Sequence, residues 1–80
     1  MPEDVVVYTR GGCHLCDEAI ELLIRRGLQP RTVDIDALPE AQAETRELYD
    51  HCVPVVTFGG KVRFRGRVNE VLLDRILRQQ

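Results

Sequence analysis

No long hydrophobic run occurs in this sequence. The apolar run near its start covers only residues 5–7, whereas a transmembrane helix needs ~20 consecutive apolar residues. A secretory signal peptide needs a positively charged start and a longer apolar stretch, but the chain opens with Met-Pro-Glu-Asp. We therefore expect a cytoplasmic protein in a reducing compartment, with no membrane as a partner.

A large charge of one sign is missing as well. The 11 Lys and Arg residues and 13 Asp and Glu residues leave a formal net charge of −2, which argues against binding to nucleic acid. Hydrophobic residues make up 44% and charged residues 30% of the chain, the balance of a folded globular domain. Because repeats, linkers and low-complexity segments are also absent, we expect one domain over residues 1–80.

The two periodicities of regular secondary structure alternate along the chain. β-Branched runs and apolar–polar alternation indicate strands, apolar residues at helical spacing indicate helices, and Gly59-Gly60 between two β-rich runs indicates a hairpin. The predicted order is strand 5–8, a helix from the residue pair 13 and 16 to about 26, strand 31–36, helix 39–50, strands 55–58 and 61–64, and a last helix capped by Asn69.

This order fixes the class of fold. The first β-α-β unit requires two parallel strands joined by a right-handed crossover, and the later hairpin adds antiparallel strands. The sequence therefore predicts an α/β domain with the order β-α-β-α-β-β-α, in which three helices cover a four-stranded mixed sheet.

Cysteine is scarce, but two of the three cysteines, Cys13 and Cys16, lie at the start of the first predicted helix. This spacing can bring their sulfurs close enough to form a small disulfide ring. Unpaired N–H groups and the helix dipole stabilise a thiolate at a helix N-terminus, and the thiolate is the nucleophile in disulfide exchange. Cys13 is therefore the expected attacking thiol and Cys16 the resolving thiol. Arg10 is a permanent cation nearby, and His14 adds a further positive charge when it is protonated.

Two other interpretations of the cysteines remain open. Both could be packed apolar residues without a chemical role. Alternatively, the chain offers the ligand types of a Cys3His zinc site, drawn from Cys13, Cys16, Cys52 and either His14 or His51. Such a non-catalytic or metal-binding module is the alternative to a redox function, although the adjacency of His51 and Cys52 makes simultaneous ligation awkward.

The motif and its surroundings resemble the glutaredoxins of the thioredoxin superfamily over essentially the whole chain. The sequence Thr-Arg-Gly-Gly precedes Cys-His-Leu-Cys, Val-Asp-Ile-Asp follows it, and Val-Pro-Val-Val opens a later strand. These features are most similar to the short bacterial glutaredoxin-like proteins. The resemblance implies a thioredoxin-like fold and thiol-disulfide exchange with a disulfide-containing protein or a low-molecular-weight thiol, driven by a thiol reductant or reductase.

The resemblance also implies roles for single residues. Cys13 and Cys16 become the catalytic pair, and Val53-Pro54 becomes the loop that faces them, with a cis bond expected at Pro54. We expect substrate binding at Arg10, His14, Val53 and Pro54. The redox-active disulfide needs no metal and no further cofactor, and we expect a monomer.

Glutathione binding is expected to be weak. Glutaredoxins usually have Pro and an aromatic residue between the cysteines, where this chain has His14 and Leu15. Residues 66–69 stand where the family usually has a Gly-Gly-containing stretch with an acidic residue.

Outside the motif, we expect Cys52 to be a packed thiol and His51 a solvated loop residue. Arg63, Arg65 and Arg67 alternate along the last strand and its exit. They form either a solvated edge or a guide for an anionic thiol or acidic partner.

Overall fold

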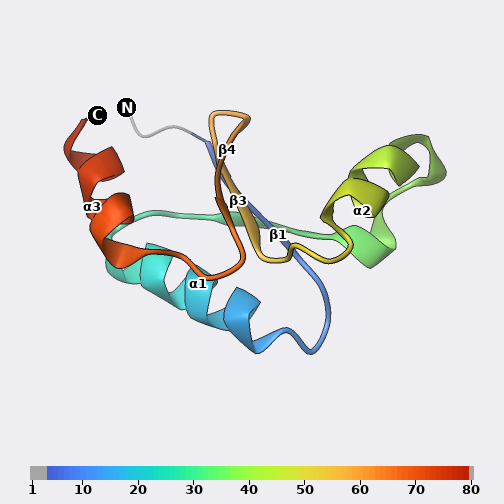
Figure 1. Ribbon diagram of the computed structural model, residues 1–80, viewed down its shortest axis with the longest axis horizontal. Coiled ribbons are helices and arrows are strands. Elements are labelled where there is room, and N and C mark those ends of the chain that lie inside the picture. The colour runs from blue at the N-terminus through green and yellow to red at the C-terminus, as the bar shows by residue number, and fades with distance from the viewer. Residues whose placement is uncertain (1–3, 80) are drawn as a thin grey trace.

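A computed structural model describes residues 4–79 of the chain (Figure 1). None of the helices in this range is long and apolar enough to cross a membrane. The predicted order of elements is confirmed: β1 (Val5–Thr9), α1 (His14–Arg25), β2 (Arg31–Asp34), the short 3₁₀ helices η1 (Ile35–Ala37) and η2 (Glu40–Gln42), α2 (Ala43–Tyr49), β3 (Val55–Phe58), β4 (Lys61–Arg65) and α3 (Glu70–Arg78).

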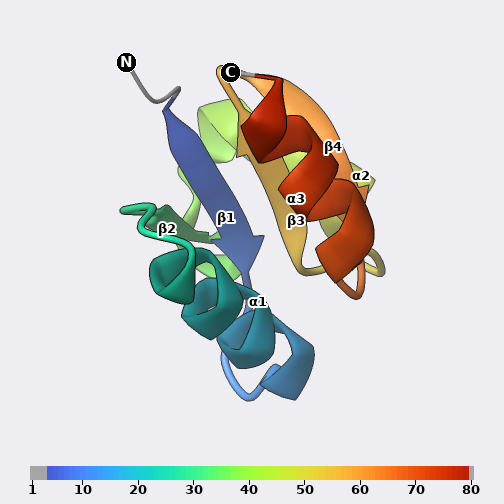
Figure 2. The same ribbon diagram turned by 90° about the vertical axis from the view of Figure 1, so that its left-hand side faces the viewer.

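The four strands form one mixed sheet in the order β2-β1-β3-β4. β1 runs parallel to β2 and antiparallel to β3, and β4 pairs antiparallel with β3. As Figure 2 shows, α1 and α3 lie on one face of this sheet and α2 lies behind the other. The predicted thioredoxin-like architecture of three helices and a four-stranded mixed sheet is therefore confirmed.

Each face of the sheet has its own hydrophobic cluster, because successive side chains of a strand point to opposite faces. Val56 belongs to the larger cluster, which also contains Ala19 and Leu23 of α1 and Leu73 and Ile76 of α3. Its neighbour on the other face, Val55, packs with Ile35 and Tyr49. The sheet is therefore covered on both sides, and only its ends and edges stay accessible.

Two predicted elements are shorter than expected. The strand predicted over residues 31–36 ends at Asp34, because the Asp34 side chain accepts a hydrogen bond from the Asp36 N–H at 2.9 Å and turns the chain into η1. The helix predicted over residues 39–50 is divided into η2 and the seven-residue α2. Of the residues in α2, only Tyr49 is buried, so tertiary packing supports little more than this last turn of the segment.

Candidate active site

Strand register brings three loops to the same end of the sheet. Tyr8 pairs with Val55, and Val55 pairs with Arg65, so these three residues form one row across β1, β3 and β4. Because β1 and β4 end near this row and β3 begins there, residues 10–13, 53–54 and 66–69 lie together at this end of the sheet. The Gly66 N–H connects two of these loops by donating to the carbonyl oxygens of Pro54, at 2.8 Å, and Cys52, at 3.2 Å.

The first cysteine of the motif caps α1. Cys13 has extended backbone angles (φ −91°, ψ 105°), and its Sγ accepts a hydrogen bond from the Cys16 N–H at 3.1 Å. Gly12, directly before it, has φ +76°, a conformation that favours glycine. The sulfur thus occupies the position of an N-cap oxygen, where an amide of the first turn points at it. That geometry suits a sulfur that carries negative charge.

The two cysteines differ in exposure. Cys13 is half-buried, whereas the side chain of Cys16 is 0% exposed. Burial raises the pKa of the Cys16 thiol, and its hydrogen bond with Cys13 raises that pKa further, against smaller opposing effects of the Thr9 side chain and the Arg10 backbone. Cys16 therefore holds its proton at neutral pH, while the sulfur of Cys13 is the one open to solvent.

The Val53–Pro54 peptide bond is cis, as predicted. Pro54 is buried, and Val53 is half-buried against the cluster of Ile35, Tyr49 and Val55. Cys52 packs partly against the same cluster, as expected of a packed thiol.

Comparison with known proteins identifies the family. The family model described as Glutaredoxin matches residues 5–63, which is more than half of the chain. The chain belongs to the glutaredoxin family. None of the curated proteins is similar enough in sequence to match it.

Solved structures agree with this assignment. A glutaredoxin from Archaeoglobus fulgidus shares 26% identity with a TM-score of 0.68, covering 95% of this chain and 87% of that chain. A protein from Nitrosomonas europaea also shares 26% identity, with a TM-score of 0.75 and coverage of 95% and 92%. A buckwheat glutaredoxin in complex with glutathione shares the fold at 24% identity and a TM-score of 0.64, covering 79% of this chain and 61% of its own.

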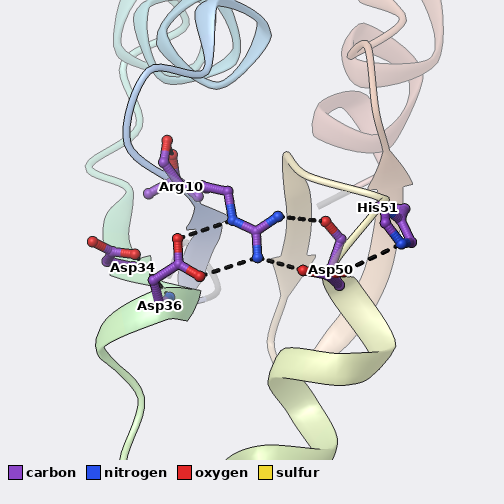
Figure 3. A network of polar contacts seen from close by, with 6 residues as sticks. Arg10, Asp34, Asp36, Asp50 and His51 are labelled. Carbon is purple, nitrogen blue, oxygen red and sulfur yellow. Dashed lines mark hydrogen bonds and ion pairs between the residues drawn. The ribbon is translucent and has the colours of Figure 1, made fainter.

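In this glutaredoxin, Arg10 lies in a network of ion pairs (Figure 3). Its Nε and Nη2 donate to the two carboxylate oxygens of Asp36 at 2.9 and 3.0 Å. Its Nη1 donates to the backbone carbonyl of Asp50 at 2.8 Å, and Nη2 also donates to the Asp50 carboxylate. His51, which is 93% exposed as predicted, pairs with the other Asp50 oxygen at 3.2 Å. Neither aspartate is predicted from sequence as a partner of Arg10.

Hydrogen bonds in the network favour the charged forms of Arg10 and Asp50. The hydrogen bonds to Asp36 and Asp50 raise the pKa of Arg10, and the Arg10 guanidinium lowers the pKa of Asp50. The Arg10 guanidinium therefore uses its donors on Asp36 and Asp50. These contacts connect the loop before Cys13 to the segment that leads to Pro54.

A groove of about 600 Å³ begins at the motif and runs between α1 and the segment before α3. Its wall on α1 includes Leu15, Ala19 and Leu22, and its opposite wall includes Arg67 and Val68. Leu15, the residue between His14 and Cys16, is 36% exposed. Charged side chains share the lining with these apolar ones, namely Glu18, Glu21, Arg25 and Glu70, and the groove reaches the motif at Leu15.

The last question is whether the predicted zinc ligands and His14 lie close enough together to hold a metal ion. His14 is exposed at the first residue of α1. Within residues 4–79, no group of three or more His, Cys, Asp or Glu side chains is placed so that it could hold a metal ion. The ligand set of the zinc alternative, Cys13, Cys16, Cys52 and a histidine, is thus not brought together in this part of the chain.

Proposed function

We propose that this glutaredoxin is a thiol-disulfide oxidoreductase that uses the Cys13–Cys16 dithiol to reduce disulfides in proteins or small thiols. The observation that carries the proposal is the pairing of an accessible, amide-capped sulfur on Cys13 with a fully buried thiol on Cys16. The family assignment supports the same chemistry.

The reaction has two exchange steps. The Cys13 thiolate attacks one sulfur of a substrate disulfide R–S–S–R′, a bond forms between Cys13 and R–S, and R′–S⁻ leaves. Cys16 then attacks the Cys13 sulfur and its proton passes to solvent or to a departing thiolate, so that R–S⁻ leaves and the Cys13–Cys16 disulfide remains. Two electrons pass from the dithiol to the substrate. An external thiol reductant or reductase returns two electrons and one proton, which restores the Cys13 thiolate and the protonated Cys16.

The raised pKa of Cys16 gives the steps their order. A resolving thiol that stays protonated does not compete with Cys13 for the substrate, and it becomes a nucleophile only when it loses its proton. Burial enforces the same order, because a substrate sulfur can approach Cys13 from solvent but not Cys16.

Substrate binding is proposed at the loops around Cys13. His14 offers an exposed side chain next to the nucleophile, and Val53-Pro54 lies at the same end of the sheet. Arg10 contributes by holding these loops, since its donors already bind Asp36 and Asp50.

A buckwheat relative forms a complex with glutathione, but His14-Leu15 and residues 66–69 depart from the usual family residues. Because of these differences, we propose that glutathione binds weakly here. We also propose that the protein acts as a monomer in the reducing cytoplasm.

Thiol titration tests the proposal. The reduced, denatured protein has three thiols to titrate. Treatment of the folded protein with a stoichiometric small disulfide should remove two of them together, and dithiothreitol should restore both. The Cys52→Ser variant is the matched control, because it should start with two thiols and lose both. Loss of a single thiol contradicts the dithiol mechanism, and stoichiometric release of zinc from the purified protein supports the metal-binding alternative.

A further inference from the structure

The thiol of Cys16 lies in an interior without charged side chains. It is 0% exposed and shares a face of α1 with Ala19 and Leu23 of the larger hydrophobic cluster. Within residues 4–79, no Asp, Glu, Lys, Arg or His side chain is buried. A negative charge in such surroundings is costly unless hydrogen-bond donors reach it. The proposed mechanism nevertheless requires Cys16 to lose its proton when it attacks Cys13.

Thr9, the last residue of β1, faces α1. Val7 belongs to the larger cluster, which α1 and α3 cover, whereas Tyr8 packs in the cluster on the other face of the sheet. Because side chains alternate along a strand, Thr9 points to the same side as Val7. The loop of residues 10–13 joins β1 to α1, so the first turn of α1, which carries Cys16, lies near the end of β1 (Figure 2).

Two donors act on the Cys16 sulfur from this end of β1. The Thr9 hydroxyl and the Arg10 N–H both lower the pKa of Cys16, against the larger effect of burial. Donors do so because they stabilise the negative charge of a thiolate. The Thr9 hydroxyl donates to the Arg10 carbonyl oxygen only at 3.5 Å, whereas hydroxyl donors prefer about 2.5–3.0 Å. This long contact leaves the hydroxyl able to rotate toward the sulfur.

The other groups around Cys16 offer no substitute for these donors. The elements packed against this face of α1 contribute apolar side chains, among them Val56 of β3 and Leu73 of α3. His14 and Asp17, its titratable neighbours along α1, are exposed. The nearby thiol of Cys13 raises the pKa of Cys16 instead of lowering it. The Arg10 guanidinium is held by Asp36 and Asp50.

We propose that the Thr9 hydroxyl and the Arg10 N–H form a two-donor site that stabilises the Cys16 thiolate in the second exchange step. The inference rests on the proposed function and assigns Thr9 a part in it. As the Cys16 proton passes to solvent or to a departing thiolate, the Thr9 O–H turns from the Arg10 carbonyl to the Cys16 sulfur. When the disulfide forms, the negative charge departs on R–S⁻ and the hydroxyl is released.

The first exchange step does not use this site. The sulfur of Cys13 accepts the Cys16 N–H at 3.1 Å and is open to solvent. A loss of the Thr9 hydroxyl should therefore slow the resolution of the mixed disulfide and leave the attack on the substrate unchanged.

A coloured disulfide separates the two steps in one reaction. Dithiobis(2-nitrobenzoate) releases one coloured thiolate when Cys13 attacks it and a second one when Cys16 resolves the mixed disulfide. The rate of the first phase depends on concentration, whereas that of the second does not. Each protein carries Cys52→Ser, so that two thiols remain, and receives one equivalent of the reagent.

Thr9→Val keeps the branched shape of the side chain but removes the donor. A hydrogen bond to a charged group lowers the pKa of a thiol by about one unit, so its loss should reduce the Cys16 thiolate fraction at pH 7 about tenfold. The remaining thiolate is more basic and about threefold more nucleophilic. We therefore expect the second phase to slow about threefold, with the first phase within about twofold. The difference should shrink in alkaline solution, where Cys16 ionises in both proteins.

Two control variants assign the effect to the hydroxyl. Thr9→Ser keeps the donor and should retain both rates. Thr57→Val makes the same chemical change at a buried threonine in β3, which points to the other face because it follows Val56, and it should also retain both rates. Equal slowing of both phases in Thr9→Val overturns the proposal, as does a slower second phase that does not vary with pH. An equal effect of Thr57→Val overturns it as well.

Titration of Cys16 separates the donor site from the exchange chemistry. In Cys13→Ser/Cys52→Ser, Cys16 is the remaining thiol, and serine is itself a good N-cap for α1. The Cβ chemical shift of Cys16 should show a pKa about one unit higher when Thr9→Val or Thr9→Ala is added, and no change with Thr9→Ser. If the wild type releases no second coloured thiolate, the proposed function fails, and this titration still decides the donor site. An unchanged pKa in both variants that lack the hydroxyl overturns it.

Discussion

Arg10 binds Asp50 through both its backbone carbonyl and its carboxylate, although 40 residues separate the two in the sequence. The same guanidinium holds Asp36. One side chain thus connects the exit of β1, the turn after β2 and the end of α2. The exit of β1 continues directly into Cys13, and the end of α2 continues into Val53-Pro54.

Removing the Arg10 guanidinium should slow disulfide exchange without changing the two cysteines. We expect Arg10→Gln to lower the single-turnover rate with bis(2-hydroxyethyl) disulfide by about tenfold, within the ~10²-fold cost of a 1 Å misplacement. Arg10→Lys should recover only part of this rate, because lysine cannot bridge two carboxylates with a planar fork. Arg31→Gln is the control, since its ion pair with Asp4 lies at the start of β1 and β2. An equal loss in both Gln variants contradicts a specific role of Arg10.

Replacing each of the two cysteines by serine should stop exchange at a different step. Cys13→Ser should abolish exchange because it removes the accessible nucleophile, whereas Cys16→Ser should still attack but stop at the mixed disulfide. Non-reducing gels of each variant with a disulfide-containing protein substrate distinguish the two results. Alkylation of the reduced wild type followed by peptide mapping should find Cys13 modified and Cys16 protected. Modification of Cys16 first reverses the assignment of attacker and resolver.

Stability should fall in alkaline solution because of Cys16. Its pKa is raised in the folded protein above the ordinary value of about 9. The unfolded state therefore loses the thiol proton first as the pH rises, and unfolding becomes more favourable above pH ~9. The contribution is fully present below this pH and is lost as the pH rises toward the folded-state pKa. Urea unfolding under reducing conditions from pH 7 to about pH 10.5 measures the slope.

Variants assign this slope to Cys16. Cys16→Ala should flatten the loss of stability above pH ~9, whereas Cys52→Ala should retain it. If both variants keep the wild-type slope, other groups cause the alkaline loss.

Cys52 should be dispensable for exchange. It packs partly against the cluster of Ile35 and Tyr49, and Cys13 with Cys16 already forms a complete pair. We expect Cys52→Ser to retain the rate with bis(2-hydroxyethyl) disulfide to within about twofold, with a loss of stability of ~1 kcal/mol at most for a half-buried thiol. A loss of turnover as large as that of Cys13→Ser contradicts this prediction.

Glutathione should be a poor reductant for this protein. The residues between the cysteines are His14 and Leu15, and residues 66–69 lack the acidic residue usual in glutaredoxins. Turnover coupled to glutathione and its reductase should rise in proportion to glutathione concentration without saturating. Dithiothreitol, which needs no binding site, is the control reductant. Saturation at low glutathione shows that a binding site is present.

The parts of the fold and site that follow local rules could be predicted from sequence. The Cys13–Cys16 spacing at a helix start, the hairpin around Gly59-Gly60 and the Asn69 cap, whose side chain accepts from the Leu72 N–H at 3.0 Å, depend on residues close in the chain. The cis bond at Pro54 was predicted only from the resemblance to glutaredoxins.

Long-range partners could not be predicted in the same way. Apolar–polar alternation correctly places Asp36 outside the core, but it cannot show that Arg10, 26 residues earlier, reaches it. The end of β2 was missed because the hydrogen bond between the Asp34 side chain and Asp36 overrides the alternating pattern. The groove beside Leu15 depends on how α1 and the segment before α3 pack, which no single segment encodes.

The position of Cys13 as the cap of α1 means that the helix cap and the proposed nucleophile share one atom. While its sulfur is free, it accepts the Cys16 N–H and holds the first turn in place. Once that sulfur is bonded to a substrate it carries no charge and is a weaker acceptor, so the first turn is held least firmly in the mixed disulfide. In the proposed mechanism Cys16 moves toward Cys13 in that state, so bond formation at the first cysteine would itself loosen the segment that carries the second.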